Sequence, residues 1–139
     1  MYERINRFAP LLGRLLLSAI FLVSATLKVV YWTGSVQGLE AKHVPAAPLL
    51  LAAAVTLELA GGTALISGLL ARPAALLLFL YLIPTTLLFH NFWAFSGSEQ
   101  PGQMINFLKN LAIMGGLLLL AANGPGPFSL RLPKAAPQQ

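Results

Sequence analysis

The amino-acid sequence predicts an all-α integral membrane protein, a four-helix bundle with both termini in the cytoplasm. Three observations lead to this fold class. Hydrophobic residues make up 57% of the 139 residues and charged residues only 9%, whereas a typical soluble domain is about 25% charged. Mean hydropathy is +0.75. Four stretches are long and apolar enough to cross a bilayer, which takes about 20 residues per helix.

The four transmembrane helices are predicted at about residues 11–30, 49–71, 73–92 and 105–122. Only Ala71 and Arg72 separate the second helix from the third, so we expect a tight antiparallel hairpin. Pro84 lies inside the third helix and is expected to kink it. Two Gly-Gly pairs, at 61–62 and 115–116, are small enough to let helix backbones approach closely, which is also what ordinary packing requires.

The segments outside these helices are expected to be short. Residues 1–10 are predicted to form an N-terminal cytoplasmic or interfacial segment, and residues 123–139 a Pro-rich cytoplasmic tail. The outer loops are 31–47 and 93–103. The N-terminal arginines and the apolar run after them also resemble a signal peptide with a small-residue site at "VSA". The run continues past this site and three more spans follow, which favours a membrane helix.

Lysine and arginine residues set the expected orientation, because cytoplasmic loops of membrane proteins carry an excess of them. The side with both termini would hold Arg4, Arg7, Arg14, Arg72, Arg131 and Lys134. The opposite side has Lys42 in its loops, together with Glu40 and Glu99. We therefore expect both termini in the cytoplasm.

The residue types that the chain lacks exclude several kinds of chemistry. It has no cysteine, and so no disulfide, thiolate metal site or iron–sulfur cluster of its own. It has no aspartate, and therefore no Ser–His–Asp set. Two histidines and one intramembrane glutamate fall short of a usual metal ligand set. Membrane orientation explains the net charge of +5. We expect no metal, no covalent cofactor and no nucleic-acid partner. The catalytic residues are unknown, and whether the chain is an enzyme stays open.

Polar residues of all four helices are expected to meet in the outer half of the bundle. Asn106, Lys109 and Asn110 are three or four residues apart and share one helix face. Glu58 is the deepest, about 15 Å from the outer end of its helix by helical rise. A charge at that depth normally faces the bundle interior and is paired, and Lys28 and Lys109 are the natural partners. The predicted ligand-binding residues are Lys28, Glu58, His90, Asn91, Asn106, Lys109 and Asn110.

Five of these residues also have a purely structural interpretation. Lys28 is within a turn of its helix end and can extend to the membrane interface. His90 precedes aromatic residues in the pattern of an interfacial aromatic belt. Asn106 and Asn110 can hold helices together by hydrogen bonds. Glu58 can belong to an ion pair that only stabilises the bundle.

Four blocks of the sequence carry a resemblance to a known family: "GRLLLSAIFLVSATLKV", "LELAGGTALISGLLARPAALLL", "LLFHNFW" and "QMINFLKNLAIMGGLLLL". Over about residues 11–130, the chain resembles the DoxX family of small bacterial and archaeal membrane proteins. The resemblance implies a four-helix bundle in the bacterial or archaeal cytoplasmic (inner) membrane and a link to quinone-dependent redox systems. The matching positions are Lys28, Glu58, Gly62, Arg72, His90, Phe107, Lys109 and Asn110. Some related proteins use cysteine pairs in disulfide chemistry, a role this chain cannot share.

Three functions are consistent with these features. The first is a DoxX-like protein that binds a quinone-like small molecule, or supports redox chemistry, within a membrane oxidoreductase system; a quinone would then be a non-covalent cofactor. The second is a structural or assembly subunit of a larger membrane complex, and the third is a small transporter. The lipid bilayer is the first expected partner. Other membrane redox subunits and a second copy of the chain are further candidates.

Overall fold

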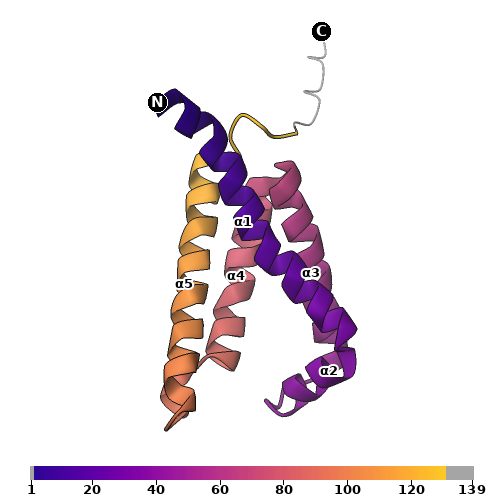
Figure 1. The fold of residues 1–139 in the computed structure, drawn as a ribbon. Helices are drawn as coiled ribbons and strands as arrows, with labels where there is room; N and C mark the ends of the chain where they lie inside the picture. Colours follow the sequence, from indigo (N-terminus) through magenta and orange to yellow (C-terminus); the bar gives the residue numbers. More distant parts are fainter. Residues whose placement is uncertain (1, 131–139) are drawn as a thin grey trace.

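The computed structural model describes residues 2–130, and its architecture is a bundle of four long helices (Figure 1). These are α1 (Tyr2–Val30), α3 (Ala47–Ser67), α4 (Ala71–Phe89) and α5 (Glu99–Asn123). Two short helices lie between them, α2 (Trp32–Glu40) and the 3-10 helix η1 (Phe92–Ala94). Each of the four long helices is long and apolar enough to cross a membrane. The predicted all-α, four-helix membrane fold is therefore confirmed.

The four long helices alternate in direction, so the start of α1 and the end of α5 lie at the same end of the bundle (Figure 1). We call this the terminal end, and the end with α2 and η1 the loop end. Helix α1 packs along α3, α3 packs against α4, and α4 packs against α5. Helix α1 crosses the bundle obliquely, so that it is near α5 at the terminal end and diverges from it toward the loop end.

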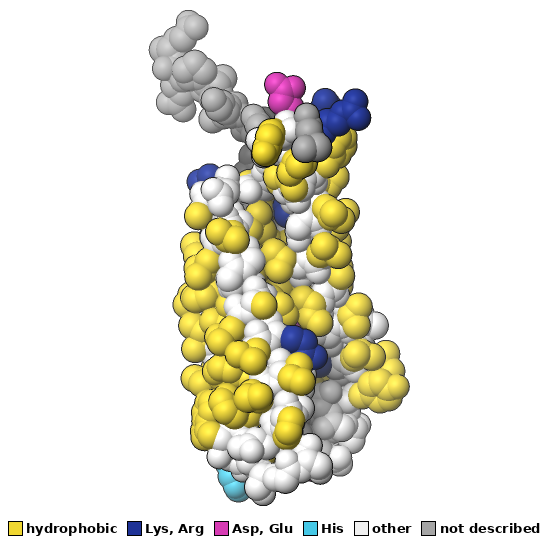
Figure 2. Space-filling view, turned by 60° about the vertical axis from the view of Figure 1, so that its left-hand side comes forward, with side chains coloured by type: hydrophobic (Ala, Val, Ile, Leu, Met, Phe, Trp, Pro, Cys, Tyr) yellow, Lys and Arg dark blue, Asp and Glu magenta, His cyan; other side chains and the backbone are white. Residues whose placement is uncertain are grey.

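The centre of the bundle is filled mainly by leucine and alanine side chains. Among them, Leu65, Leu78 and Leu117 are fully buried. The outer surface is also apolar, as the yellow side chains along the length of the molecule show (Figure 2). A soluble monomer rarely exposes so large an apolar surface. In a bilayer, this surface faces lipid.

Several helices begin or end away from their predicted limits. The segment 1–10 was expected to be separate, but α1 runs without a break from Tyr2 and contains Pro10. Helix α5 begins at Glu99 instead of residue 105, since an acidic residue and a proline in the first turn both favour a helix start. Residues 31–47 were expected to be a loop, yet they contain α2. Its nine residues include two glycines, which weaken the helical signal in the sequence.

The tight hairpin between the second and third spans is confirmed, with three residues between α3 and α4. Gly68 ends α3 with a positive φ of 76°, and its N–H donates to the carbonyl oxygen of Ala64. A left-handed residue at this position closes the last turn of a helix, and glycine adopts that conformation at little cost.

The described part of the Pro-rich tail, residues 124–130, has no regular helix and is tied to the terminal end. Arg14 Nη2 donates a hydrogen bond to the carbonyl oxygen of Phe128. The backbone N–H of Leu130 donates to the carbonyl oxygen of Ser67 at 2.9 Å. The rings of Phe8 and Phe128 stack with centroids 5.3 Å apart. The remainder of the predicted tail, 131–139, lies outside the described residues.

Three of the four paired glycines are at close helix–helix contacts. An added Cβ at Gly61 would lie 2.9 Å from side-chain atoms of Leu78, and one at Gly62 would lie 2.8 Å from Leu22. At Gly116 the corresponding distance, to Leu17, is 3.1 Å, while Gly115 has open space around it. Small residues are therefore required at the α3 pair, whereas Gly115 has no packing reason to be glycine.

This difference gives a test of helix packing. We expect Gly61→Ala to destabilise the bundle by about 1–3 kcal/mol, because the fully buried Leu78 has no room to move away. Gly115→Ala is the matched control and should be neutral or slightly stabilising, since alanine favours helix over glycine. Unfolding by SDS in mixed micelles measures both. Equal effects of the two substitutions would contradict the packing explanation.

Placement of the terminal end in the cytoplasm remains a prediction from the charge distribution. Because the chain has no cysteine, single-cysteine variants report accessibility without background. We expect a membrane-impermeant maleimide to label Ser96→Cys in intact spheroplasts, and to label Arg4→Cys only after the membrane is opened. The reverse labelling pattern would show the opposite orientation.

Candidate functional site

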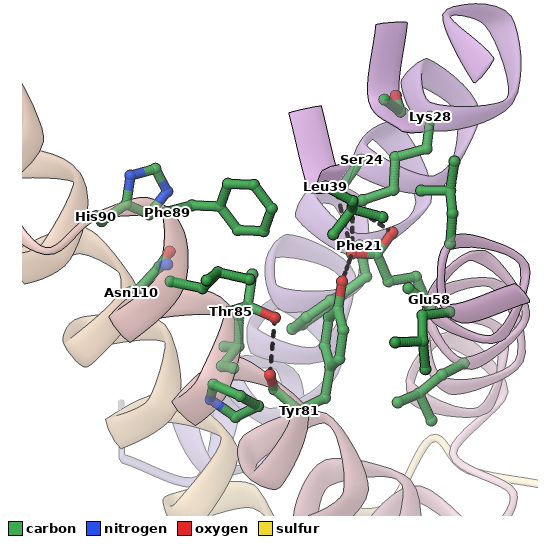
Figure 3. A pocket seen from close by; sticks show the side chains of 18 of the residues that line it. Phe21, Ser24, Lys28, Leu39, Glu58, Tyr81, Thr85, Phe89, His90 and Asn110 are labelled. Carbon is green, nitrogen blue, oxygen red and sulfur yellow. Dashed lines mark hydrogen bonds and ion pairs between the residues drawn. The ribbon is translucent and has the colours of Figure 1, made fainter. Parts of the chain in front are cut away.

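A cavity of about 940 Å³ occupies the loop-end half of the bundle, where α1 and α5 diverge (Figure 3). Its volume falls in the range of about 300–1,000 Å³ typical of small-molecule sites. Residues from α1, α2, α3, α4 and α5 line it. Most of the lining is apolar, including Ile20, Phe21, Leu39, Leu57, Leu88 and Phe89. The polar lining residues come from two groups on different sides of the cavity.

The first polar group surrounds the carboxylate of Glu58, which is only 3% exposed. Lys28 Nζ lies 2.7 Å from Glu58 Oε1 and 2.9 Å from Oε2. Oε1 also accepts hydrogen bonds from Ser24 Oγ at 3.1 Å and from Tyr81 Oη at 2.9 Å. Within residues 2–130 this is the one ion pair. We call these four residues the Glu58 network.

The Glu58 network joins three helices through one carboxylate. Ser24 and Lys28 are four residues apart on α1 and therefore share a face. Lys28 Nζ also donates to Ser24 Oγ, which fixes both side chains toward α3. Tyr81 reaches the same carboxylate from α4 (Figure 3). Of the two lysines that the sequence offered as partners for Glu58, the structure selects Lys28, so this lysine points inward and not to the membrane interface.

The second polar group lies on α5 and at the end of α4. His90 Nδ1 is 2.9 Å from Gln103 Oε1. An amide oxygen only accepts, so Nδ1 carries the hydrogen and Nε2 of a neutral ring is left as an acceptor. Asn110 Nδ2 donates to Thr86 Oγ1 at 3.0 Å, which links α5 to α4. Asn106, which comes between Gln103 and Asn110 along α5, also lines the cavity.

Lys109 is the free cation of the cavity. It lines the cavity and is exposed, and no hydrogen-bond or ion-pair partner for it occurs among residues 2–130. It lies ten residues into α5, about 15 Å from the start of the helix by helical rise. Because Lys28 neutralises Glu58, the positive charge of Lys109 is not balanced within the cavity.

The loop end of the bundle carries α2, which borders the cavity, and a cluster of aromatic side chains. Ser35 and Leu39 of α2 face the cavity. Lys42 Nζ lies over the ring of Phe95, 5.6 Å from its centroid, and connects the segment after α2 to the segment after η1. Phe92 and Trp93 of η1 pack edge-on against Phe107. Aromatic residues are enriched at membrane interfaces, and this cluster is of that kind.

The structure brings together six of the seven predicted ligand-binding residues: Lys28, Glu58, His90, Asn106, Lys109 and Asn110 line the cavity. Asn91 does not. It precedes η1, and its Oδ1 is buried without a partner among the described residues.

Tyr81 was missed by the sequence analysis. A tyrosine in the middle of an apolar span needs a partner for its hydroxyl, and that requirement could have identified it. Thr86 was missed as well. Thr86 lies in an apolar run, four residues before His90 and three before Phe89, and nothing in this pattern marks it as a site residue.

The described residues contain no group of three or more His, Cys, Asp or Glu side chains that could hold a metal ion. The side chains at the cavity can supply hydrogen bonds and electrostatic attraction. Lys109 can donate, His90 Nε2 can accept, and the asparagine amides can do both.

Comparison with known families agrees with this architecture. The family model for DoxX matches residues 9–91, which is more than half of the chain. The chain belongs to the DoxX family. A model for the SURF4 family also matches, over residues 54–135, so the two matches overlap in α3 and α4. The family that the sequence blocks indicated is thus confirmed.

Two relatives of this DoxX-family protein are inner membrane proteins of Escherichia coli strain K12. Inner membrane protein YphA is 33% identical over 120 residues, which cover 86% of each chain. Inner membrane protein YqjF is 35% identical over 128 residues, 92% of this chain and 93% of the relative. No solved structure gives a significant match. Together with the four candidate spans, these relatives place the protein in the cytoplasmic membrane as a multi-pass protein.

The Glu58 network predicts an asymmetric response to substitution. Lys28→Met should destabilise the bundle by about 3–5 kcal/mol, because it leaves a buried carboxylate without a counter-charge. Glu58→Gln should cost less, since glutamine keeps an oxygen acceptor for Ser24 and Tyr81. The double variant Lys28→Met with Glu58→Leu should recover most of the loss. SDS unfolding of all three compares these costs, and a neutral Lys28→Met would show that the ion pair does not hold the helices.

Proposed function

We propose that this DoxX-family protein binds a quinone-like small molecule in the cavity and serves as a ligand-binding component of a membrane oxidoreductase system. The observation that supports this proposal is the combination of an apolar cavity of about 940 Å³ with polar groups on two sides of it. A quinone has carbonyl oxygens on opposite sides of an apolar ring and an isoprenoid tail. It therefore needs a few donors in a cavity that is otherwise apolar.

The charges and hydrogen bonds assign different roles to the polar residues. The carboxylate of Glu58 already accepts from three side chains, so its role is to shape the cavity wall. Lys109 has its donors free and is proposed to donate to a ligand carbonyl. His90 Nε2 is proposed to accept a hydrogen bond from the hydroxyl of the reduced, quinol form. The cavity would thus recognise both redox forms with different side chains.

The apolar part of the ligand would lie along the leucine and phenylalanine side chains of the cavity wall. Phe21, Leu57 and Leu82 continue the cavity from the polar groups toward the centre of the bundle. Residues of both α1 and α5 line the cavity, and the proposed entry route from the bilayer runs between these two helices. A ligand dissolved in the membrane would reach the site by that route without crossing water.

Quinone binding is testable on the purified protein. We expect ubiquinone or menaquinone to co-purify in mild detergent, and a short-chain quinone to bind and quench Trp fluorescence. Lys109→Met should weaken this binding by about tenfold or more, since it removes a hydrogen bond from a charged donor. Thr56→Ala is the control. Thr56 is exposed on the outside of α3 and bonds to its own helix at Ala52.

The outcomes separate the proposed function from its alternatives. Unchanged quinone affinity in folded Lys109→Met and His90→Leu variants would contradict the site. Recovery of the protein without quinone, but with a stoichiometric membrane partner that Lys109→Met releases, would instead support a structural subunit in which Lys109 meets another chain.

A further inference from the structure

The charges in the lining of the loop-end cavity do not cancel, and binding of a neutral quinone leaves this imbalance in place. Of the described residues, the ionisable ones that line the cavity are Lys28 on α1, Glu58 on α3, Tyr81 and His90 from α4 and its end, and Lys109 on α5. Helix α2 contributes Ser35, Gly38 and Leu39, which carry no charge. Lys28 and Glu58 form an ion pair. The positive charge of Lys109 is therefore the one that the lining does not balance.

Lys28 does not share this role, because its hydrogens are already used. An ammonium group has three N–H donors. Those of Lys28 reach Oε1 and Oε2 of Glu58 and Oγ of Ser24. Tyr81 likewise gives its O–H hydrogen to Glu58 Oε1. The Glu58 network is thus neutral as a whole, and its lysine and tyrosine donors are occupied within it.

The donors that a ligand can use are on one face of α5. Lys109 has no partner among residues 2–130. Asn106 is three residues before it and Asn110 one residue after it, and both line the cavity. Asn110 donates one amide hydrogen to Thr86 Oγ1, and an amide has two. Asn110 lies across the cavity from Glu58 (Figure 3). A ligand oxygen at this face therefore meets an ammonium group flanked by two amides.

An ionised oxygen fits this face better than a carbonyl oxygen does. Ionisable residues within transmembrane helices usually pair with an opposite charge, and they mark substrate sites. Among the described residues, the one carboxylate of the cavity lining is that of Glu58, which is already paired. Hydrogen bonds between two charged groups are roughly twice as strong as those between neutral groups. The attraction is greater still beside an apolar wall, because it increases as the dielectric constant falls.

We infer that the ligand of the loop-end cavity is an anion: a quinone-like ring with an ionised hydroxyl group, held with its charged oxygen at Lys109 and its ring against the apolar wall. In the ionised form of a hydroxyquinone, the charge is shared with the ring carbonyl that is conjugated to the hydroxyl. Lys109 can therefore donate to either oxygen. This inference rests on the proposed function, and it narrows the ligand class from quinones in general to acidic hydroxyquinones.

Calorimetric titration of the full chain in nanodiscs tests this inference, with empty nanodiscs as the lipid blank. The probes are lawsone, a hydroxynaphthoquinone that is ionised at neutral pH, and its methyl ether, which keeps the ring and both carbonyls but has no charge. We expect the wild type to bind lawsone about tenfold or more tightly than the ether, because only lawsone forms a charge-assisted hydrogen bond with an anionic oxygen.

Three variants assign the preference to one side chain. Lys109→Met should remove the preference for lawsone over the ether, whereas Lys109→Arg should keep most of it because the charge remains. Lys42→Met is the matched control, since it removes a lysine at the same end of the bundle but outside the cavity lining. Its preference for lawsone should equal that of the wild type.

The comparison of the two probes on the wild type does not depend on any variant being folded. Equal or tighter binding of the ether would overturn the inference and leave the proposed function in place. Absence of binding by both quinones would count against the proposed function, and this inference would fail with it. A preference for lawsone that survives in folded Lys109→Met would overturn the role of Lys109. Decanoate is the third probe, and displacement of lawsone by decanoate with equal affinity would show a site for any anionic amphiphile, which also overturns the inference.

Discussion

The buried carboxylate of Glu58 is the constraint on which the arrangement of the loop-end half depends. A single oxygen accepts from Ser24, Lys28 and Tyr81, so α1, α3 and α4 meet at one fixed point inside the membrane. In an apolar environment no water competes for these hydrogen bonds. Neighbouring glycines of α3 let the backbones of α1 and α4 come close enough for the contact. The carboxylate of Glu58 therefore fixes the positions of these three helices relative to one another.

Helix α5 is held differently, and this difference creates the cavity. It packs on α4 through buried leucines such as Leu117, is linked to α4 by the Asn110–Thr86 hydrogen bond, and meets η1 through the ring of Phe107. No side chain of α5 enters the Glu58 network. The polar residues of α5 consequently remain on the far side of a space that the three tied helices leave open. Among them, Lys109 lines this space without a partner among residues 2–130.

Most of the fold, and six of the seven residues proposed for the candidate site, could be predicted from the sequence. Hydropathy and length were enough for the four spans, and helical spacing placed Asn106, Lys109 and Asn110 on one face. Spacing within a helix does not determine which helices become neighbours at a given depth. The choice of Lys28 over Lys109 as the partner of Glu58 therefore had to come from the structure. The short helix α2 was missed because its stability comes from packing on α3, and its own residues favour helix only weakly.

The length of helix α1 has a further consequence. Its 29 residues extend about 43 Å at the usual helical rise, whereas a hydrocarbon core is about 30 Å thick. The excess length is at the terminal end, where the first turns of α1 carry Glu3, Arg4 and Arg7. There the ring of Phe8 stacks on Phe128 of the segment that follows α5. The part of α1 that extends past its apolar stretch thus gives the chain after the last span a surface to pack against.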